Sequence, residues 1–168
     1  MNVLVLAVVA VAVAGSSPGS WTAHPDGRIG PFRIDVTTEA QIRAELGRPL
    51  GVEPVYWPTQ KAVYGRRLTY RCGPKCRTDY SINSRTGKLS DFWSQSHRFV
   101  TERGTRPGMT AREAKARERK TLLPGCGSAR YIHLRWDQRH GFVLVISHRR
   151  VESIGYLGPH TISYEGLC

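Results

Sequence analysis

The sequence predicts an α+β protein made of two tandem units, each a short helix followed by a small antiparallel β-sheet. The first observation is a helix-start pattern that occurs twice in the 168 residues, at Thr38 and at Thr110. A threonine can cap a helix because its hydroxyl accepts a hydrogen bond from a backbone N–H of the first turn. The second observation is that each helix start is followed by segments in which apolar and polar residues alternate, as in half-buried strands. Helices and antiparallel strands in this order predict the α+β class.

The first 27 residues are expected to precede the folded part. The apolar run Val3–Ala14 would span only about 18 Å as a helix, too short for a bilayer core of about 30 Å. Its length and its small final residues are typical of a secretory signal peptide over residues 1–14, cleaved after Ala14. The run departs from the usual signal peptide in having no Lys or Arg before it. The alternative to a signal peptide is an uncleaved buried segment. Residues 15–27, rich in Gly, Ser and Pro, are expected to form a flexible leader.

The first unit is expected to span residues 28–100. Its helix should run from Thr38 to Leu46, because Gln41 can complete a capping box with Thr38 and Gly47 provides a typical helix end. Alternation of apolar and polar residues predicts most of the strands around it. The other elements expected are a short strand over Ile29–Ile34, a loop over Pro49–Pro58, strands over Val63–Cys72 and Asp79–Asn83, and a long strand over Lys88–Val100 that breaks near Ser94–Ser96.

The second unit is expected to span residues 101–168. Its helix should begin after Thr110, with Glu113 completing the capping box, and reach about Thr121. The helix carries five basic residues, which suit binding in a groove, but the interleaved Glu113 and Glu118 favour an ordinary solvent-exposed face. Strands are expected over Arg130–Trp136, Phe142–Ser147 and Val151–Leu157.

The chain is strongly basic, and its four cysteines suggest an oxidising compartment. There are 25 Lys and Arg against 13 acidic residues, a formal net charge of +12. A positive field of this size favours acidic partners such as a wall polymer, nucleic acid or an acidic protein; solubility and genome composition are the alternative explanation. Four cysteines allow three pairings, of which we favour Cys72–Cys76 and Cys126–Cys168. A zinc site is the competing interpretation, but the Cys-x3-Cys spacing has no matching second pair.

Two short motifs suggest a family. The patterns are G-x-x-x-G-M-T-x-x-E-A over Gly104–Ala114 and T-x-x-Q-I-x-x-x-L-G-x-P over Thr38–Pro49. They resemble the repeat shared by the β-lactamase-inhibitor-protein family and the outer-membrane assembly lipoproteins of the SmpA/OmlA type, which occurs in tandem in secreted actinobacterial proteins. The resemblance covers roughly residues 28–157. It implies a helix followed by a small sheet, used as a binding scaffold and not as an enzyme. No inhibitory residue carries over, because no motif matches that surface.

The sequence contains none of the common catalytic or cofactor motifs. None of the six His falls in an HxxxH or HExxH pattern, and no P-loop, GxGxxG or GxSxG is present. We therefore expect no cofactor, no metal site and no catalytic residue. His133, between Tyr131 and Arg135 on an expected strand, could bind an anion or act as a general base beside a phosphate. An ordinary solvent-exposed strand surface is the alternative.

These observations favour a small, basic, secreted binding module that is not an enzyme, either a protein inhibitor or a cell-envelope interaction protein. The alternative is a basic secreted hydrolase or nuclease-type toxin, which a cleft with converging His, Arg and carboxylate groups would favour. The expected partner is an acidic extracellular protein or an envelope polymer, not a small-molecule substrate, and no stable membrane span is expected after signal cleavage. The candidates for partner binding lie on the strand faces turned away from the helices, unless these are plain solvated surfaces: Arg67, Thr69, Arg71, Tyr131, His133 and Arg135.

Overall fold

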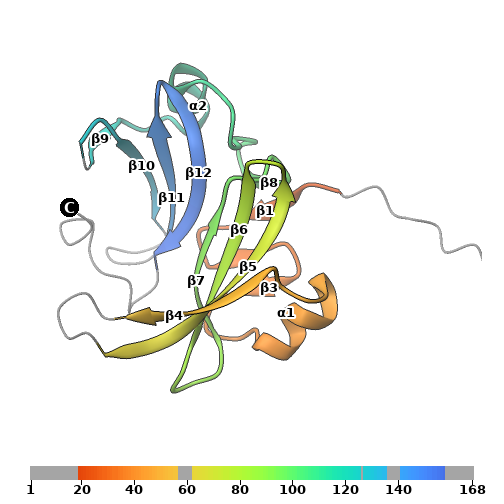
Figure 1. Cartoon of the computed structure of the whole chain (residues 1–168). Coiled ribbons are helices and arrows are strands. Elements are labelled where there is room, and N and C mark those ends of the chain that lie inside the picture. Colours follow the sequence, from red (N-terminus) through yellow and green to blue (C-terminus); the bar gives the residue numbers. More distant parts are fainter. Residues whose placement is uncertain (1–18, 57–61, 126, 136–140, 158–168) are drawn as a thin grey trace, which may run out of the picture.

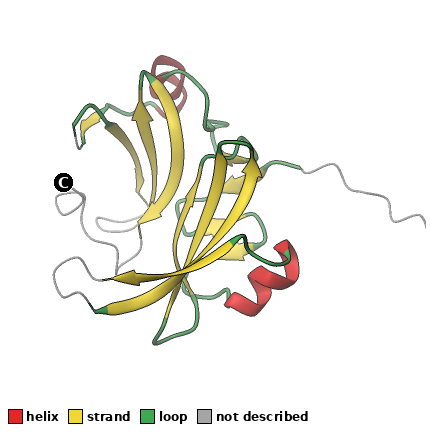
Figure 2. Ribbon diagram, viewed as in Figure 1, coloured by secondary structure: helices red, strands yellow, loops and turns green. Residues whose placement is uncertain are grey.

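The protein is mostly β. Strands hold 52% of the described residues and helices 13%. The helices of the described part are the short α1 (Glu39–Leu46) and α2 (Ala111–Glu118) (Figure 2). The predicted α+β class, with one small sheet for each helix, is therefore wrong: the strands form one sheet of four and one of eight. The computed structural model describes residues 19–56, 62–125, 127–135 and 141–157.

The larger sheet joins strands from both halves of the chain (Figure 1). At its centre β7 and β12 pair antiparallel, with Ser94 opposite Ile154 and Phe92 opposite Tyr156. This pairing joins the strands of the first half of the chain to those of the second half, edge to edge. The two groups of strands therefore form one continuous sheet and not two small ones. Its strands are, in spatial order, β4 (Gly51–Tyr56), β5 (Val63–Gly73), β6 (Cys76–Asn83), β7 (Leu89–Ser94), β12 (Arg150–Leu157), β11 (Gly141–Ser147), β10 (Arg130–Arg135) and β9 (Leu123–Pro124).

The smaller sheet is built partly from the stretch expected to be a flexible leader. Residues 21–23 form a strand that pairs parallel with residues 99–101, so the leader prediction is wrong for that segment. The physical reason is aromatic packing: the ring of Trp21 lies edge-on to Phe32 and to Phe99, with centroids 5.5 Å apart in both pairs. The sheet order is β3 (Phe32–Arg33), β2 (Arg28–Ile29), β1 (Trp21–Ala23) and β8 (Phe99–Thr101).

Both predicted helix starts are confirmed. Thr38 and Gln41 form a reciprocal capping box before α1, and Thr110 and Glu113 form one before α2. α1 ends at Gly47, whose N–H donates to the carbonyl of Arg43 at 2.8 Å. Within the described ranges, no helix is long and apolar enough to cross a membrane.

Some element boundaries differ from the prediction. Residues 49–58 were expected to be a loop, but Gly51–Tyr56 forms β4, the edge strand beside β5. α2 ends at Glu118 because Arg119 adopts the left-handed conformation (φ 53°).

The predicted break in the long strand after Lys88 is confirmed, since β7 ends at Ser94 and β8 begins at Phe99. A bulge in β7 opposite Ser81 and Ile82 explains why the apolar residues of this strand do not share one parity.

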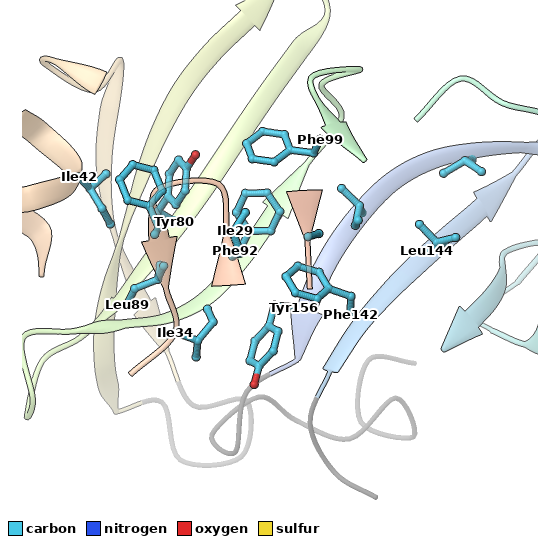
Figure 3. Packing of buried hydrophobic residues seen from close by; sticks show 14 of the residues in the cluster. Ile29, Ile34, Ile42, Tyr80, Leu89, Phe92, Phe99, Phe142, Leu144 and Tyr156 are labelled. Atoms are coloured by element: carbon cyan, nitrogen blue, oxygen red, sulfur yellow. The ribbon is translucent and has the colours of Figure 1, made fainter. Parts of the chain in front are cut away.

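The core lies between the larger sheet and the smaller sheet with α1. Figure 3 shows Tyr80 and Phe92 from one half of the larger sheet beside Phe142 and Tyr156 from the other. The rings of Phe92 and Phe142 lie 6.3 Å apart, so aromatic contacts cross the β7–β12 junction. The smaller sheet closes this core with Phe99, whose ring lies 4.7 Å from that of Phe92. One core therefore serves the whole described chain.

Candidate functional site

The six predicted partner-binding residues lie on one face of the larger sheet, but in two separate groups. Arg67, Thr69 and Arg71 belong to β5, and the other three belong to β10. The strand order puts β6, β7, β12 and β11 between them, which corresponds to roughly 24 Å at the usual strand spacing. The predicted face exists, but the sheet does not bring its two groups of residues together.

The β10 group is not an open surface. Tyr131 is 7% exposed, and its ring lies against Gly125, where a Cβ atom would meet it at 2.2 Å. His133 is half-buried and makes contacts of its own. The side chain of Arg135 lies outside the described part. The idea that this trio forms an exposed anion site is therefore wrong for its Tyr131 member, because that side chain is packed.

Carboxylates interrupt the basic character of the same face near its centre. Asp79 is buried; it accepts a hydrogen bond from Thr69 Oγ1 at 2.8 Å and lies 3.3 Å from the Arg77 guanidinium. Asp91 is 3% exposed and accepts from its neighbour Ser90. Burial raises the pKa of Tyr64, and the Asp91 carboxylate raises it further. On β6 and β7, this face therefore carries carboxylates that already accept hydrogen bonds from neighbouring side chains.

A hollow, here called the disulfide cleft, lies at the end of the sheet where the β5–β6 hairpin turns. It consists of two adjoining hollows of about 670 Å³ and 440 Å³ that share Gly73, Lys75, Cys76 and Gln95. Two of the predicted residues, Thr69 and Arg71, line the smaller hollow. The larger one also includes side chains from the β7–β8 loop, from the loop before α2 and from the β11–β12 turn.

The predicted Cys72–Cys76 disulfide is confirmed and forms one wall of the cleft. Its Cα atoms are 5.0 Å apart. The ladder pairs Arg71 with Arg77 and then Gly73 with Cys76, so Cys72 is the extra residue of a bulge. Arg71 and Lys75, which lie next to the bulge, line the cleft together with the bridge. The second predicted bridge, Cys126–Cys168, lies outside the described residues.

The β7–β8 loop forms a second wall and is held by its own side chains. Ser94 Oγ accepts from the Ser96 N–H at 3.0 Å, and Ser96 Oγ accepts from the Arg98 N–H at 3.2 Å. The Arg98 guanidinium lies 3.7 Å from the centroid of the Trp21 ring, a cation–π contact. The His97 ring lies on Gly108, where a Cβ atom would be 2.5 Å from it. The loop is therefore fixed before any ligand arrives.

The third wall is a tight two-residue turn between β11 and β12. Ser147 pairs with Arg150, and the two residues between them, His148 and Arg149, both have positive φ, 48° and 61°. Non-glycine residues rarely adopt this conformation, and strained turns of this kind gather at functional sites. Arg150 Nη1 donates to the carbonyl of Gly108 at 2.9 Å, which ties the turn to the loop before α2.

The charged residues that line the cleft are nearly all cationic. Five Arg or Lys side chains line it against the single acid Glu152. In the described part of the chain, ion pairing within the lining is restricted to Arg77, which pairs with Asp79. The other four basic residues of the lining are Arg71, Lys75, Arg98 and Arg150. Such a surface suits carboxylate or phosphate groups, to which guanidinium groups donate two hydrogen bonds at once.

The cleft also contains two imidazoles, His97 and His148. Ser147 Oγ lies 2.9 Å from Nδ1 of His148. His24 contacts the Glu102 carboxylate at 2.7 Å, but neither residue lines this cleft. Among the described residues, no three His, Cys, Asp or Glu side chains lie close enough together to hold a metal ion. The cleft thus offers proton-transfer groups without the carboxylate partner that usually orients them.

Sequence reasoning found Thr69 and Arg71 but missed most of the cleft. Strand alternation identifies which side chains share a face, whereas the cleft is built from turns. The signal that could have shown it is that three basic turns, at residues 73–76, 95–98 and 147–150, end strands of the same sheet.

Comparison with known proteins gives a likeness of fold alone. No family model and no curated protein matches the chain. A 1.5 Å crystal structure of an extracellular protein containing a SCP domain, from Bacillus anthracis str. Ames, superposes with a TM-score of 0.51 at 11% sequence identity. The match covers 93% of this chain and 51% of that chain, so this chain spans about half of the other protein's length. The resemblance to the β-lactamase-inhibitor-protein repeat stays a prediction.

Proposed function

We propose that this protein is a small basic secreted binding module that holds an acidic extracellular partner in the disulfide cleft, without catalysis. The partner is an acidic protein or an envelope polymer, and inhibition of a partner enzyme is one form this binding can take. The observation that carries the proposal is the lining of the cleft, five basic side chains against one acid. Complementary charge of this kind increases the association rate and selects acidic partners.

Two further observations support an extracellular site of action. The Cys72–Cys76 disulfide is of the kind that persists in oxidising compartments. The structural neighbour from Bacillus anthracis str. Ames is described as an extracellular protein. Both agree with the export signal expected over residues 1–14, which lies outside the described residues.

The walls of the cleft suit binding because they are held in place without a ligand. The disulfide, the stacking of Arg98 on Trp21 and the bond from Arg150 to Gly108 each fix one wall. A preorganised site loses less conformational entropy when a partner binds, so its charges contribute more to affinity.

The test is a charge reversal at the tip of the disulfide hairpin, Arg71→Glu with Lys75→Glu. Partners are captured from culture supernatant with the mature protein and with this variant. The matched control is Arg85→Glu with Lys88→Glu, the same charge change in the exposed β6–β7 turn at the other end of β6. Wild type and control should retain the partner and release it as salt rises, whereas the cleft variant should not retain it. Equal retention by all three proteins would place binding elsewhere.

A basic secreted hydrolase or nuclease-type toxin is the second candidate function. The observation that favours it is that His97 and His148 line the same cleft as Arg98 and Arg150. Two imidazoles can transfer protons while guanidinium groups hold a phosphodiester. The test is hydrolysis of RNA by the wild type and by His97→Ala and His148→Ala. Activity that both variants lose would establish this function, and an inactive wild type would remove it.

A further inference from the structure

The outer face of α2 differs from what its sequence indicates, because neither of its acids lines the basic hollow on that face. The Glu113 carboxylate accepts hydrogen bonds from the N–H and the hydroxyl of Thr110, at 2.9 and 2.7 Å. Glu118 is 4% exposed and accepts from Thr101 Oγ1 at 2.6 Å. Glu113 stabilises the start of the helix, and Glu118 ties its end to β8. Glu113 is exposed but is bound to the cap Thr110, and Glu118 is buried. The acids that the alternating sequence suggests therefore do not line the hollow.

What remains on that face is a ring of cations around a small residue. An open hollow of about 460 Å³ is lined by four basic side chains together with Ala116 and Thr121. Ala116 is exposed, and its short side chain leaves the space that the longer side chains surround. In the described part of the chain, none of the four basic residues forms an ion pair. These residues, the α2 basic face, are Arg112, Lys115, Arg119 and Lys120.

We propose that the α2 basic face is a second binding surface, separate from the disulfide cleft, that binds a linear phosphate-rich polyanion over Ala116. The two surfaces share no lining residue. The proposal does not rest on the function proposed for the cleft, because the α2 basic face can bind its own ligand whether or not the cleft does.

Charge density distinguishes phosphate from carboxylate at this surface. From Arg112 to Arg119 the helix rises roughly 10 Å. An extended polypeptide advances at most about 3.5 Å per residue and alternates its side chains, so it presents about two carboxylates on one side over that length. A phosphate chain carries charge on every unit, and phosphates accept the bidentate hydrogen bonds that Arg donates. Four cations around one hollow therefore match the closely spaced charges of a phosphate chain better than those of an acidic polypeptide.

A bilayer surface is a poorer fit for the same helix. Helices that lie in a membrane interface need a face with large apolar residues that enter the acyl region. α2 offers Ala114 as its buried apolar residue, and the hollow is lined by Ala116 and Thr121 besides the cations. The ligand is therefore expected to be a polymer in solution or in the envelope matrix.

The test uses Ala116→Glu with Ala116→Gln as its matched control, because the two side chains have the same size and differ in charge. The probe is short-chain inorganic polyphosphate, titrated calorimetrically at several salt concentrations. Wild type should bind, the Gln variant should bind more weakly, and the Glu variant should lose binding. Among variants that still bind, each lost phosphate contact should reduce the slope of log K against log salt by about 0.7 to 0.9.

Folding is checked separately in each variant. Ala116→Glu places a carboxylate four residues after Arg112 within α2, so the thermal midpoint measured by circular dichroism should not fall. Arg112→Gln with Lys115→Gln provides a second variant that adds no new charge, and it should also weaken binding.

Three comparators decide the interpretation. The cleft variant Arg71→Glu with Lys75→Glu removes charge from the other cationic surface that can take phosphate. In this background Ala116→Glu should reduce polyphosphate binding as strongly as it does in the wild type, which would support two separate surfaces. Polyglutamate of equal charge should bind more weakly than polyphosphate. The proposal is overturned if a folded Ala116→Glu variant binds like wild type, if polyglutamate binds equally well, or if vesicles of anionic lipid bind more tightly than polyphosphate.

Discussion

Gly155 gives the most direct test of how the two halves of the larger sheet are joined. It lies in β12 directly opposite Trp93 of β7, and the indole ring covers the position where a side chain would be. A Cβ atom on Gly155 would lie 2.6 Å from Cε3 of the ring and 2.7 Å from Cδ2. Both atoms belong to the rigid indole ring, which cannot bend away locally. Gly155→Ala therefore forces the whole indole or the strand to move.

The expected loss follows from overpacking at this contact. Inserting a methyl group into a packed site typically costs about 1 to 3 kcal/mol of unfolding free energy. For a chain of this size such a loss lowers the melting temperature by about 2 to 4 °C for each kcal/mol. Because Gly155 sits at the junction of β7 and β12, we expect the value to lie in the upper part of that range.

Urea unfolding, followed by circular dichroism and by Trp fluorescence, measures this loss. The matched control is Gly51→Ala in the edge strand β4, where a Cβ atom meets nothing within 4 Å and φ is not positive. That substitution should leave stability unchanged or raise it by about 0.4 to 1 kcal/mol, because it restricts the unfolded chain.

A double-mutant cycle separates the ring contact from other causes. In a Trp93→Leu background the ring is absent, so Gly155→Ala should cost much less than it does in the wild type. The reasoning fails if Gly155→Ala unfolds at the wild-type urea midpoint, or if it costs the same with and without the indole.

Four further outcomes are expected. Thr110→Ala removes the capping hydroxyl of α2 and should cost about 1 kcal/mol, seen as a lower melting temperature; an unchanged melt would mean the cap contributes nothing. Partial burial acts to raise the pKa of Glu39, but hydrogen bonds from Arg43 and Arg66 outweigh it and the pKa is lowered. The stability advantage of wild type over Glu39→Gln should therefore be fully present above the ordinary pKa of 4.5 and be lost as pH falls through the lower folded value. A urea midpoint difference that does not change with pH would contradict this. Intact mass should show that the exported protein begins at Gly15, and retention of the apolar run would exclude cleavage there. Non-reducing peptide mapping should find the second predicted disulfide as an intrachain bond, and free thiols in that pair would show the pairing wrong.

The sequence by itself determined the features that depend on neighbours a few residues apart. Both capping boxes join a threonine to the residue three positions later, and α1 ends at Gly47 where the glycine predicts. The Cys72–Cys76 bridge closes a hairpin, and the Gly-Pro-Lys sequence between the two cysteines predicts its turn. Strand alternation predicts that Leu68 and Ile132 face the core, and both are fully buried, but it places Tyr131 outward, where the structure packs it. These interactions are local, so the order of residues is sufficient to predict them.

The tertiary structure decided which strand edges meet and which charged side chains stay exposed. Nothing in the alternation of β7 or β12 specifies that they pair with each other, because any exposed edge can accept another strand. That pairing turned two expected small sheets into one. The sequence predicts that Glu118 is an exposed acid. In the structure it is buried and accepts a hydrogen bond from Thr101, seventeen residues earlier.

The disulfide cleft has the same origin, since its walls come from turns far apart in the chain. A partner distant in sequence leaves no periodic signal, so the packing of the described chain decided the cleft. The α2 basic face comes from neighbouring residues of one helix, and tertiary packing decided there that Glu118 is buried.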